Sequence, residues 1–228
     1  MSARAVKSAV NALAQEFAGA EGHSVTCEFA PVGAIEKKLA AGATADVVIV
    51  SSSALASLGE ARQIVAGSER ALGRTSIGVA VREGKSPDIA TPDAFTALLL
   101  DAGSIALSDP AYGGTAARYL PQLFARMGLS DVLESKLVRC AGGGDVAERV
   151  ARGEAEIGIT FISEMLPIAG VRIVGALPQI YGNDTTYCAA VHVTSVAGDV
   201  ARALIAALAR PDGDRIWRSA GFVRASDG

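Results

Sequence analysis

The stretch from residue 45 to residue 53 reads Ala45-Asp46-Val47-Val48-Ile49-Val50-Ser51-Ser52-Ser53. An uninterrupted apolar run follows the single acid, which predicts a parallel strand buried on both faces. Serine commonly caps helices, so the three serines at the end of this strand predict that a helix begins near Ala54. A strand that leads directly into a helix is the repeating unit of a doubly wound α/β sheet.

The same alternation continues through the chain. Residues 5–19 have the apolar spacing of an amphipathic helix, residues 25–29 alternate like a strand, and residues 33–39 read as a second helix. Residues 76–81 and 104–108 read as further buried strands. In such sheets ligands bind at the carboxyl ends of the strands, so the loops at those ends are the places to look for a site.

A glycine-rich loop, Asp109-Pro110-Ala111-Tyr112-Gly113-Gly114-Thr115-Ala116, follows the strand at 104–108 and precedes a helix expected over 117–127. Glycines let the backbone approach a ligand, and a helix N-terminus presents N–H groups and partial positive charge. The loop matches neither the Walker A pattern nor the GxGxxG fingerprint, and no lysine follows it. We therefore expect a small anion rather than a nucleotide.

Composition narrows the range of functions. The 228 residues allow one large domain or two small ones. The net charge is -3, and the sequence lacks the basic run interleaved with aromatic residues that nucleic-acid-binding surfaces usually have, so we do not expect nucleic-acid binding. No apolar run reaches the roughly 18 residues that span a bilayer. Cys27, Cys140 and Cys188 form no CxxC pair, and neither His23 nor His192 has neighbours at metal-ligand spacing. We expect no metal and no cofactor.

Several stretches together carry a resemblance to a known family. They are Ala45–Ile49, Ile77–Arg82, Ser108–Ala111, Gly153–Gly158 and the terminal Gly221-Phe222. In this order they resemble the type II periplasmic binding proteins of the molybdate-binding kind, which are the solute receptors of ABC importers. The likeness extends over nearly the whole chain.

The resemblance implies a type II periplasmic-binding-protein fold, with two doubly wound α/β lobes and a cleft between them. Lobe one would be residues 1–74 plus 186–228, and lobe two residues 75–185. Such lobes close like a hinge around a ligand that both contact. The resemblance also implies a monomer that delivers a small anion, an oxyanion or an organic carboxylate, to an ABC permease.

In the family a strand precedes the position of Ser2-Ala3. We expect that strand either in a segment upstream of Met1, together with a signal peptide, or missing from the sheet. The resemblance implies a periplasmic protein. The alternative is a cytoplasmic one, because these residues contain no signal peptide.

The resemblance also locates the ligand residues. Ser2 matches the first ligand serine, the second falls on Val32, and the ligand tyrosine falls on Phe161, so two hydroxyl donors are absent. Losing a donor from a buried anion site costs about 1–3 kcal/mol, which argues against molybdate or tungstate. The remaining candidate ligand-binding residues are Arg4, Ser51, Ser52, Gly113, Gly114 and Thr115.

The positive charge of the arginines near these candidate positions favours an organic acid as the ligand. Arg4 stands where molybdate binders carry a neutral residue, and its planar guanidinium suits a carboxylate. Arg118 could add a second charge. For both arginines the alternative is simple exposure to solvent, and for the serines the alternative is helix capping.

Two functions from different classes remain open. One is a binding protein that performs no covalent step. The other is an enzyme, because four stretches resemble the aconitate isomerases of the same family: Ser108–Ala111, Gly113–Thr115, Ile162–Glu164 and Val174–Pro178. Such an enzyme moves a double bond in a tricarboxylate by proton transfer. Arg4 and Arg118 would then hold carboxylates and Glu164 would be the base, unless Glu164 only caps a helix.

Overall fold

The structure is a computed structural model that describes residues 1–224, and the chain falls into two compact units. Unit 1 combines Met1–Thr75 with the chain from Thr185 onward, and unit 2 is Ser76–Asp184. Strand β4 (Arg70–Arg82) carries the chain from unit 1 into unit 2, and strand β9 (Asp184–Val191) carries it back. The chain therefore passes twice between the units.

The sheet of unit 1 has the order β2-β1-β3-β9. Strand β1 (Ser2–Ala3) is parallel to both β2 (Phe29–Ala30) and β3 (Val47–Ser51), whereas β9 is antiparallel to β3. Every residue of β3 is buried, as its uninterrupted apolar run predicts.

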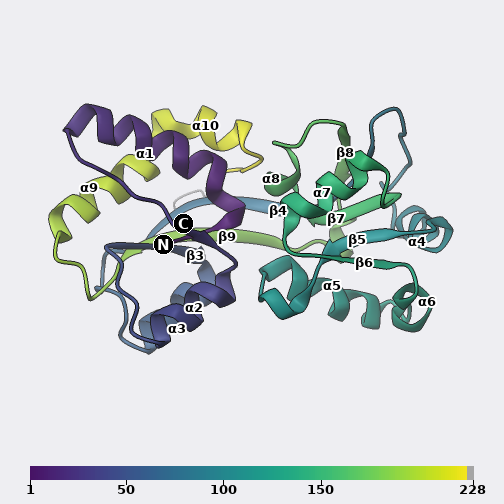
Figure 1. The fold of residues 1–228 in the computed structure, drawn as a ribbon, viewed down its shortest axis with the longest axis horizontal. Helices are drawn as coiled ribbons and strands as arrows, with labels where there is room; N and C mark the ends of the chain where they lie inside the picture. The colour runs from purple at the N-terminus through teal and green to yellow at the C-terminus, as the bar shows by residue number, and fades with distance from the viewer. Residues whose placement is uncertain (225–228) are drawn as a thin grey trace. The chain divides into compact units, whose positions relative to one another are not determined.

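Helices cover both faces of this sheet (Figure 1). The helices of one face share a core around Trp217, which is fully buried and donates its indole N–H to the carbonyl of Leu208 at 3.0 Å. That face carries α1 (Lys7–Glu21), α9 (Gly198–Ala209) and α10 (Asp214–Ser219), with short helices η1 (Arg4–Val6) and η4 (Pro211–Gly213), and the other face carries α2 (Val32–Ala40) and α3 (Ser52–Glu60).

The sheet of unit 2 is centred on β4, which pairs with β7 on one edge and β8 on the other, both antiparallel. Beyond β7 the order continues to β5 and then β6, and these three strands run parallel to one another. Their bounds are β5 (Ile105–Ser108), β6 (Leu137–Cys140), β7 (Ile157–Phe161) and β8 (Val171–Ala176).

The helices of unit 2 also lie on both faces of their sheet (Figure 1). Helix α7 packs on β5 and β7 through Val146 and Val150, which are fully buried. The helices are α4 (Pro92–Asp101), α5 (Thr115–Arg126), α6 (Ser130–Glu134), α7 (Gly143–Arg152) and α8 (Ile162–Met165), with short helices η2 (Pro110–Tyr112) and η3 (Gln179–Tyr181). None of the helices within residues 1–224 is both long and apolar enough to cross a membrane.

The strand predicted over residues 25–29 is much shorter in the structure. Residues 25–29 alternate in sequence like a strand, but only Phe29 and Ala30 pair with a neighbour. Residues 23–28 belong to no helix or strand, although the Glu28 carbonyl accepts the N–H of Ser2 at 2.8 Å. The physical reason is that β1, the neighbour along which they would pair, reaches only as far as Ser2.

Candidate functional site

Three parallel strands of unit 1 end at the same edge of its sheet. A helix follows each at once: η1 at Arg4 after β1, α2 at Val32 after β2, and α3 at Ser52 after β3. This topology places the residues of unit 1 predicted to bind ligand at one edge of that unit. They are Ser2, Arg4, Val32, Ser51 and Ser52.

The serines at this edge differ in what they do. Ser51 is buried, and its hydroxyl accepts the N–H of Ala54 at 3.4 Å, so it caps α3. Ser52 is exposed in the first turn of that helix. Ser2 is buried, with its hydroxyl 3.4 Å from the carbonyl of Ala3. Val32 is also buried and contributes no hydroxyl.

The electrostatics of this edge favour a negative ligand. Neither α2 nor α3 has an acidic residue in its first turn, so no carboxylate there offsets the partial positive charge of the helix N-terminus. Arg4, which is exposed at the start of the short helix η1, adds a full positive charge.

In unit 2 the parallel strands β5, β6 and β7 also end at one edge. Asp109, just after β5, donates its N–H to the carbonyl of Cys140 at the end of β6, at 2.8 Å. Its carboxylate accepts the N–H of Ala111 at 2.9 Å, which fixes the turn into the glycine loop. Gly113 is left-handed with φ 74°, and Gly114 occupies the cap position of α5.

Thr115 is the first residue of α5. Its hydroxyl oxygen is buried and has no hydrogen-bond partner among the described residues. The first turn of α5 contains no acid, and Arg118 is exposed in that turn. A buried hydroxyl without a partner at a helix N-terminus suits an acceptor supplied by a ligand.

The end of β7 and the short helix α8 that follows it hold the other two candidate residues of unit 2, Phe161 and Glu164. Phe161 is buried and brings no hydroxyl. Glu164 lies against the first residue of α7: a β-carbon at Gly143 would come within 2.6 Å of the Glu164 carboxyl carbon. Thr160 donates to the same carboxylate at 3.5 Å. This position, at the positive end of α7, suits a capping role for Glu164.

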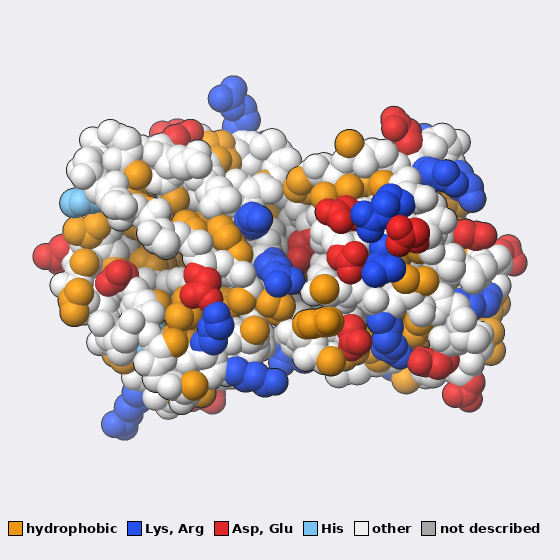
Figure 2. Space-filling view, in the orientation of Figure 1, with side chains coloured by type: hydrophobic (Ala, Val, Ile, Leu, Met, Phe, Trp, Pro, Cys, Tyr) orange, Lys and Arg blue, Asp and Glu red, His pale blue; other side chains and the backbone are white. Residues whose placement is uncertain are grey.

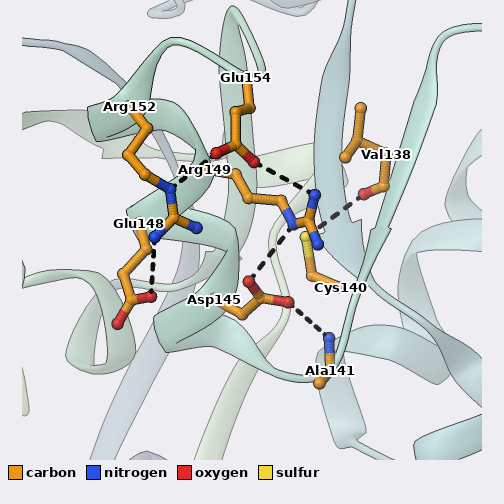
Figure 3. A network of polar contacts seen from close by, with 8 residues as sticks. All are labelled: Val138, Cys140, Ala141, Asp145, Glu148, Arg149, Arg152 and Glu154. Carbon is orange, nitrogen blue, oxygen red and sulfur yellow. Dashed lines mark hydrogen bonds and ion pairs between the residues drawn. The ribbon is translucent and has the colours of Figure 1, made fainter.

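A hydrogen bond joins the loop between β6 and α7 to the first turn of α7, beside a group of ion pairs along that helix (Figure 3). The Asp145 carboxylate accepts the N–H of Ala141 at 2.9 Å and lies 3.3 Å from Nε of Arg149. Arg149 in turn reaches Glu154 at 3.3 Å. Arg152 extends the group through Glu148 and Glu154, as Figure 3 shows, and Figure 2 shows acidic and basic side chains intermingled on the surface of unit 2.

Cys140 lies beside this network, and burial raises the pKa of its thiol to about 11, with the nearby Asp145 adding to the effect. Burial also raises the pKa of Cys27 and of Cys188. All three cysteines stay protonated at neutral pH, which is unsuited to a nucleophile. Within residues 1–224 no group of three or more His, Cys, Asp or Glu side chains is placed to hold a metal ion.

Sequence reasoning missed the contact between Gly143 and Glu164. A signal was present, because Gly142-Gly143-Gly144-Asp145 follows a strand just as Gly113-Gly114-Thr115 does. The partner of such a glycine, however, comes from a different strand end and leaves no local pattern.

Both units are thus doubly wound α/β layers with their helix N-termini gathered at strand ends, the arrangement of type II periplasmic binding proteins. The profile of the family described as bacterial extracellular solute-binding protein matches residues 1–223, and the chain belongs to that family.

Two relatives and one solved structure illustrate the match. Aconitate isomerase of Pseudomonas sp. is 37% identical over 190 residues, which cover 83% of this chain and 71% of the relative. Molybdate-binding protein ModA of Escherichia coli K12 is 25% identical over 225 residues, 97% of this chain and 86% of ModA. The periplasmic molybdate-binding protein of Azotobacter vinelandii has the same fold, with a TM-score of 0.81 at 19% identity over 99% of this chain and 98% of its own.

Proposed function

We propose that this protein binds a small organic carboxylate, using the strand-end loops of both units, as a solute receptor. The observation that carries the proposal is that α2, α3 and α5 all begin at strand ends without an acid in their first turns. Such helix ends attract anions, and the buried hydroxyl of Thr115 supplies a donor that needs an acceptor.

A carboxylate fits better than molybdate for two reasons. The positions at which molybdate binders resemble one another in offering hydroxyls are occupied here by the buried Val32 and Phe161. A dehydrated oxyanion would lose about 1–3 kcal/mol for each donor. Arg4 offers instead a planar pair of N–H donors, the geometry that matches a carboxylate.

Delivery of the ligand to an ABC permease and a periplasmic location are also part of the proposal, and family membership supports both. A receptor of this kind needs no covalent step. It needs only ligand contacts from both units that favour one arrangement of the units over another.

A second candidate function is isomerisation of a tricarboxylate, and the 37% identity to aconitate isomerase favours it. The enzyme would take a proton from a carbon next to one end of the double bond and return a proton at the other end, so that the double bond moves. Arg4 and Arg118 would hold carboxylates. Glu164 would be the base, although its position against Gly143 also suits a cap.

The test is a binding panel measured by calorimetry and thermal shift: citrate, trans-aconitate, molybdate and sulfate. We expect a thermal shift with a polycarboxylate and an affinity at least about tenfold lower in Arg4→Ala, a change of about 1.4 kcal/mol. Arg202→Ala, an exposed arginine on α9, is the matched control and should bind like wild type. Binding of molybdate with no response to carboxylates contradicts the proposal.

The enzyme alternative is tested separately, by incubating the protein with trans-aconitate and following its ultraviolet absorbance. Turnover that disappears in Glu164→Gln, while the affinity for citrate is retained, assigns the isomerase. Tight carboxylate binding without turnover assigns the receptor.

A further inference from the structure

Ser163 is a buried polar residue of unit 2 that the proposed function does not use. It is the second residue of α8, the short helix that starts where β7 ends, and it is only 3% exposed. Its hydroxyl oxygen is buried and has no hydrogen-bond partner among the described residues. Such a hydroxyl is costly, because it has lost its contacts with water and gained nothing in return. It therefore suits a partner that residues 1–224 do not supply.

The other three side chains of α8 point into unit 2. A β-carbon at Gly78 of β4 would lie 2.7 Å from Cγ1 of Ile162, so Ile162 packs on that strand. Met165 is fully buried in the core, and Glu164 lies against the first residue of α7. Successive residues of a helix are turned by about 100°, so Ser163 lies on the remaining side of α8, away from these contacts.

Ser163 stands at the same edge of unit 2 as Thr115. Strands β5 and β7 are parallel neighbours, so the segments that follow them leave the sheet side by side. Helix α5, which begins at Thr115, lies on one face of this sheet, and α8 lies with α7 on the other (Figure 1). Two buried hydroxyls, both without a partner in the described chain, thus flank these strand ends from the two faces.

We propose that Ser163 is a ligand-binding residue and that it donates, together with Thr115, to one carboxylate of the ligand. Hydrogen bonds from hydroxyls to an ionised carboxylate are among the strong ones. The inference rests on the proposed function and deepens it: Arg4 holds one carboxylate and the two hydroxyls hold another, so the ligand is a di- or tricarboxylate. Ser163 lies two residues beyond Phe161 and supplies this strand end with the hydroxyl that Phe161 lacks.

The test compares Ser163→Ala with Ser68→Ala, because both serines are buried but only Ser68 has partners. The Ser68 hydroxyl donates to the carbonyl of Val65 at 2.6 Å and accepts the N–H of Val191 at 3.0 Å. Without ligand, Ser163→Ala should keep or raise the melting temperature, since no hydrogen bond is lost, whereas Ser68→Ala should lower it. In calorimetry with citrate and with trans-aconitate, Ser163→Ala alone should lose affinity, about tenfold or more.

Double variants test which carboxylate Ser163 contacts. Residues that share a partner are coupled, so the loss of affinity in Ser163→Ala with Thr115→Val should deviate from the product of the two single losses. Ser163→Ala with Arg4→Ala should give that product, because the two residues hold different carboxylates. The reverse pattern overturns the proposal.

Wild-type affinity of Ser163→Ala for both polycarboxylates also overturns it, and the proposed function then stands without it. A melting temperature lowered as far as in Ser68→Ala has the same consequence, since the hydroxyl would then have a partner within the protein. If the wild-type protein binds neither citrate nor trans-aconitate, the proposed function itself fails, and the inference that rests on it fails too.

Discussion

At position 143 any side chain beyond hydrogen collides with Glu164, because a β-carbon there would lie 2.6 Å from the Glu164 carboxyl carbon and 2.7 Å from its Cβ. We predict that Gly143→Ala destabilises the protein by about 1–3 kcal/mol, the range for overpacking a tight contact. Gly144→Ala is the matched control, since a β-carbon at the next position of α7 meets nothing within 4 Å. Urea unfolding of the two variants measures the difference. Equal stability would show that the contact gives way freely.

His192 is a second residue whose environment has a measurable consequence. It is 3% exposed, and Thr194 donates its N–H to Nδ1 at 3.3 Å, an arrangement that suits the neutral ring. Burial, and secondarily the Met1 ammonium, lowers the pKa of His192 below 6.5. The unfolded chain therefore takes up this proton first as the pH falls.

From that difference we predict that the free energy of unfolding decreases as the pH drops below about 6.5, the usual pKa of histidine in the unfolded chain. The contribution of His192 to this decrease ends once the pH falls below the lower pKa that His192 has in the folded protein. Thermal unfolding between pH 7.5 and 5 measures it, and His192→Gln should flatten the dependence in that range. His23→Gln, an exposed histidine, is the control and should keep the slope. An unchanged slope in His192→Gln would exclude His192 as its source.

At the scale of elements, sequence patterns predicted what is local. The apolar run at 45–50 became β3 and its serines became the cap and first turn of α3, because burial on both faces and capping are encoded in adjacent residues. The glycine loop at 113–114 likewise precedes α5 as its residues predict. These junctions supplied most of the candidate site.

What the patterns could not supply is pairing. Residues 25–29 have strand alternation, yet only Phe29 and Ala30 join the sheet, because a strand forms only where a neighbour offers its backbone. Glu164 shows the same limit in the site: the resemblance offered it as a base, with helix capping as the alternative, but its contact with Gly143 of another helix left no local pattern. Both outcomes depend on residues that are remote in sequence.

At the scale of the whole molecule, the proposed site makes a prediction about motion. Over residues 1–224 the chain crosses between the units through β4 and β9, and the candidate residues are divided between the units, with Arg4 in unit 1 and Arg118 in unit 2. A ligand that contacts both sets stabilises whichever arrangement lets it do so. Saturating citrate should therefore lower the radius of gyration in small-angle X-ray scattering.

The two arginines separate binding from closure in that experiment. Arg118→Ala keeps the unit 1 contacts, so we expect it to retain weak citrate binding while the decrease in the radius of gyration at equal occupancy becomes smaller. Arg4→Ala should require much more citrate for any decrease. If calorimetry shows wild-type protein saturated with citrate while its radius of gyration stays constant, the ligand contacts one unit only, and the division of the site between two units is wrong.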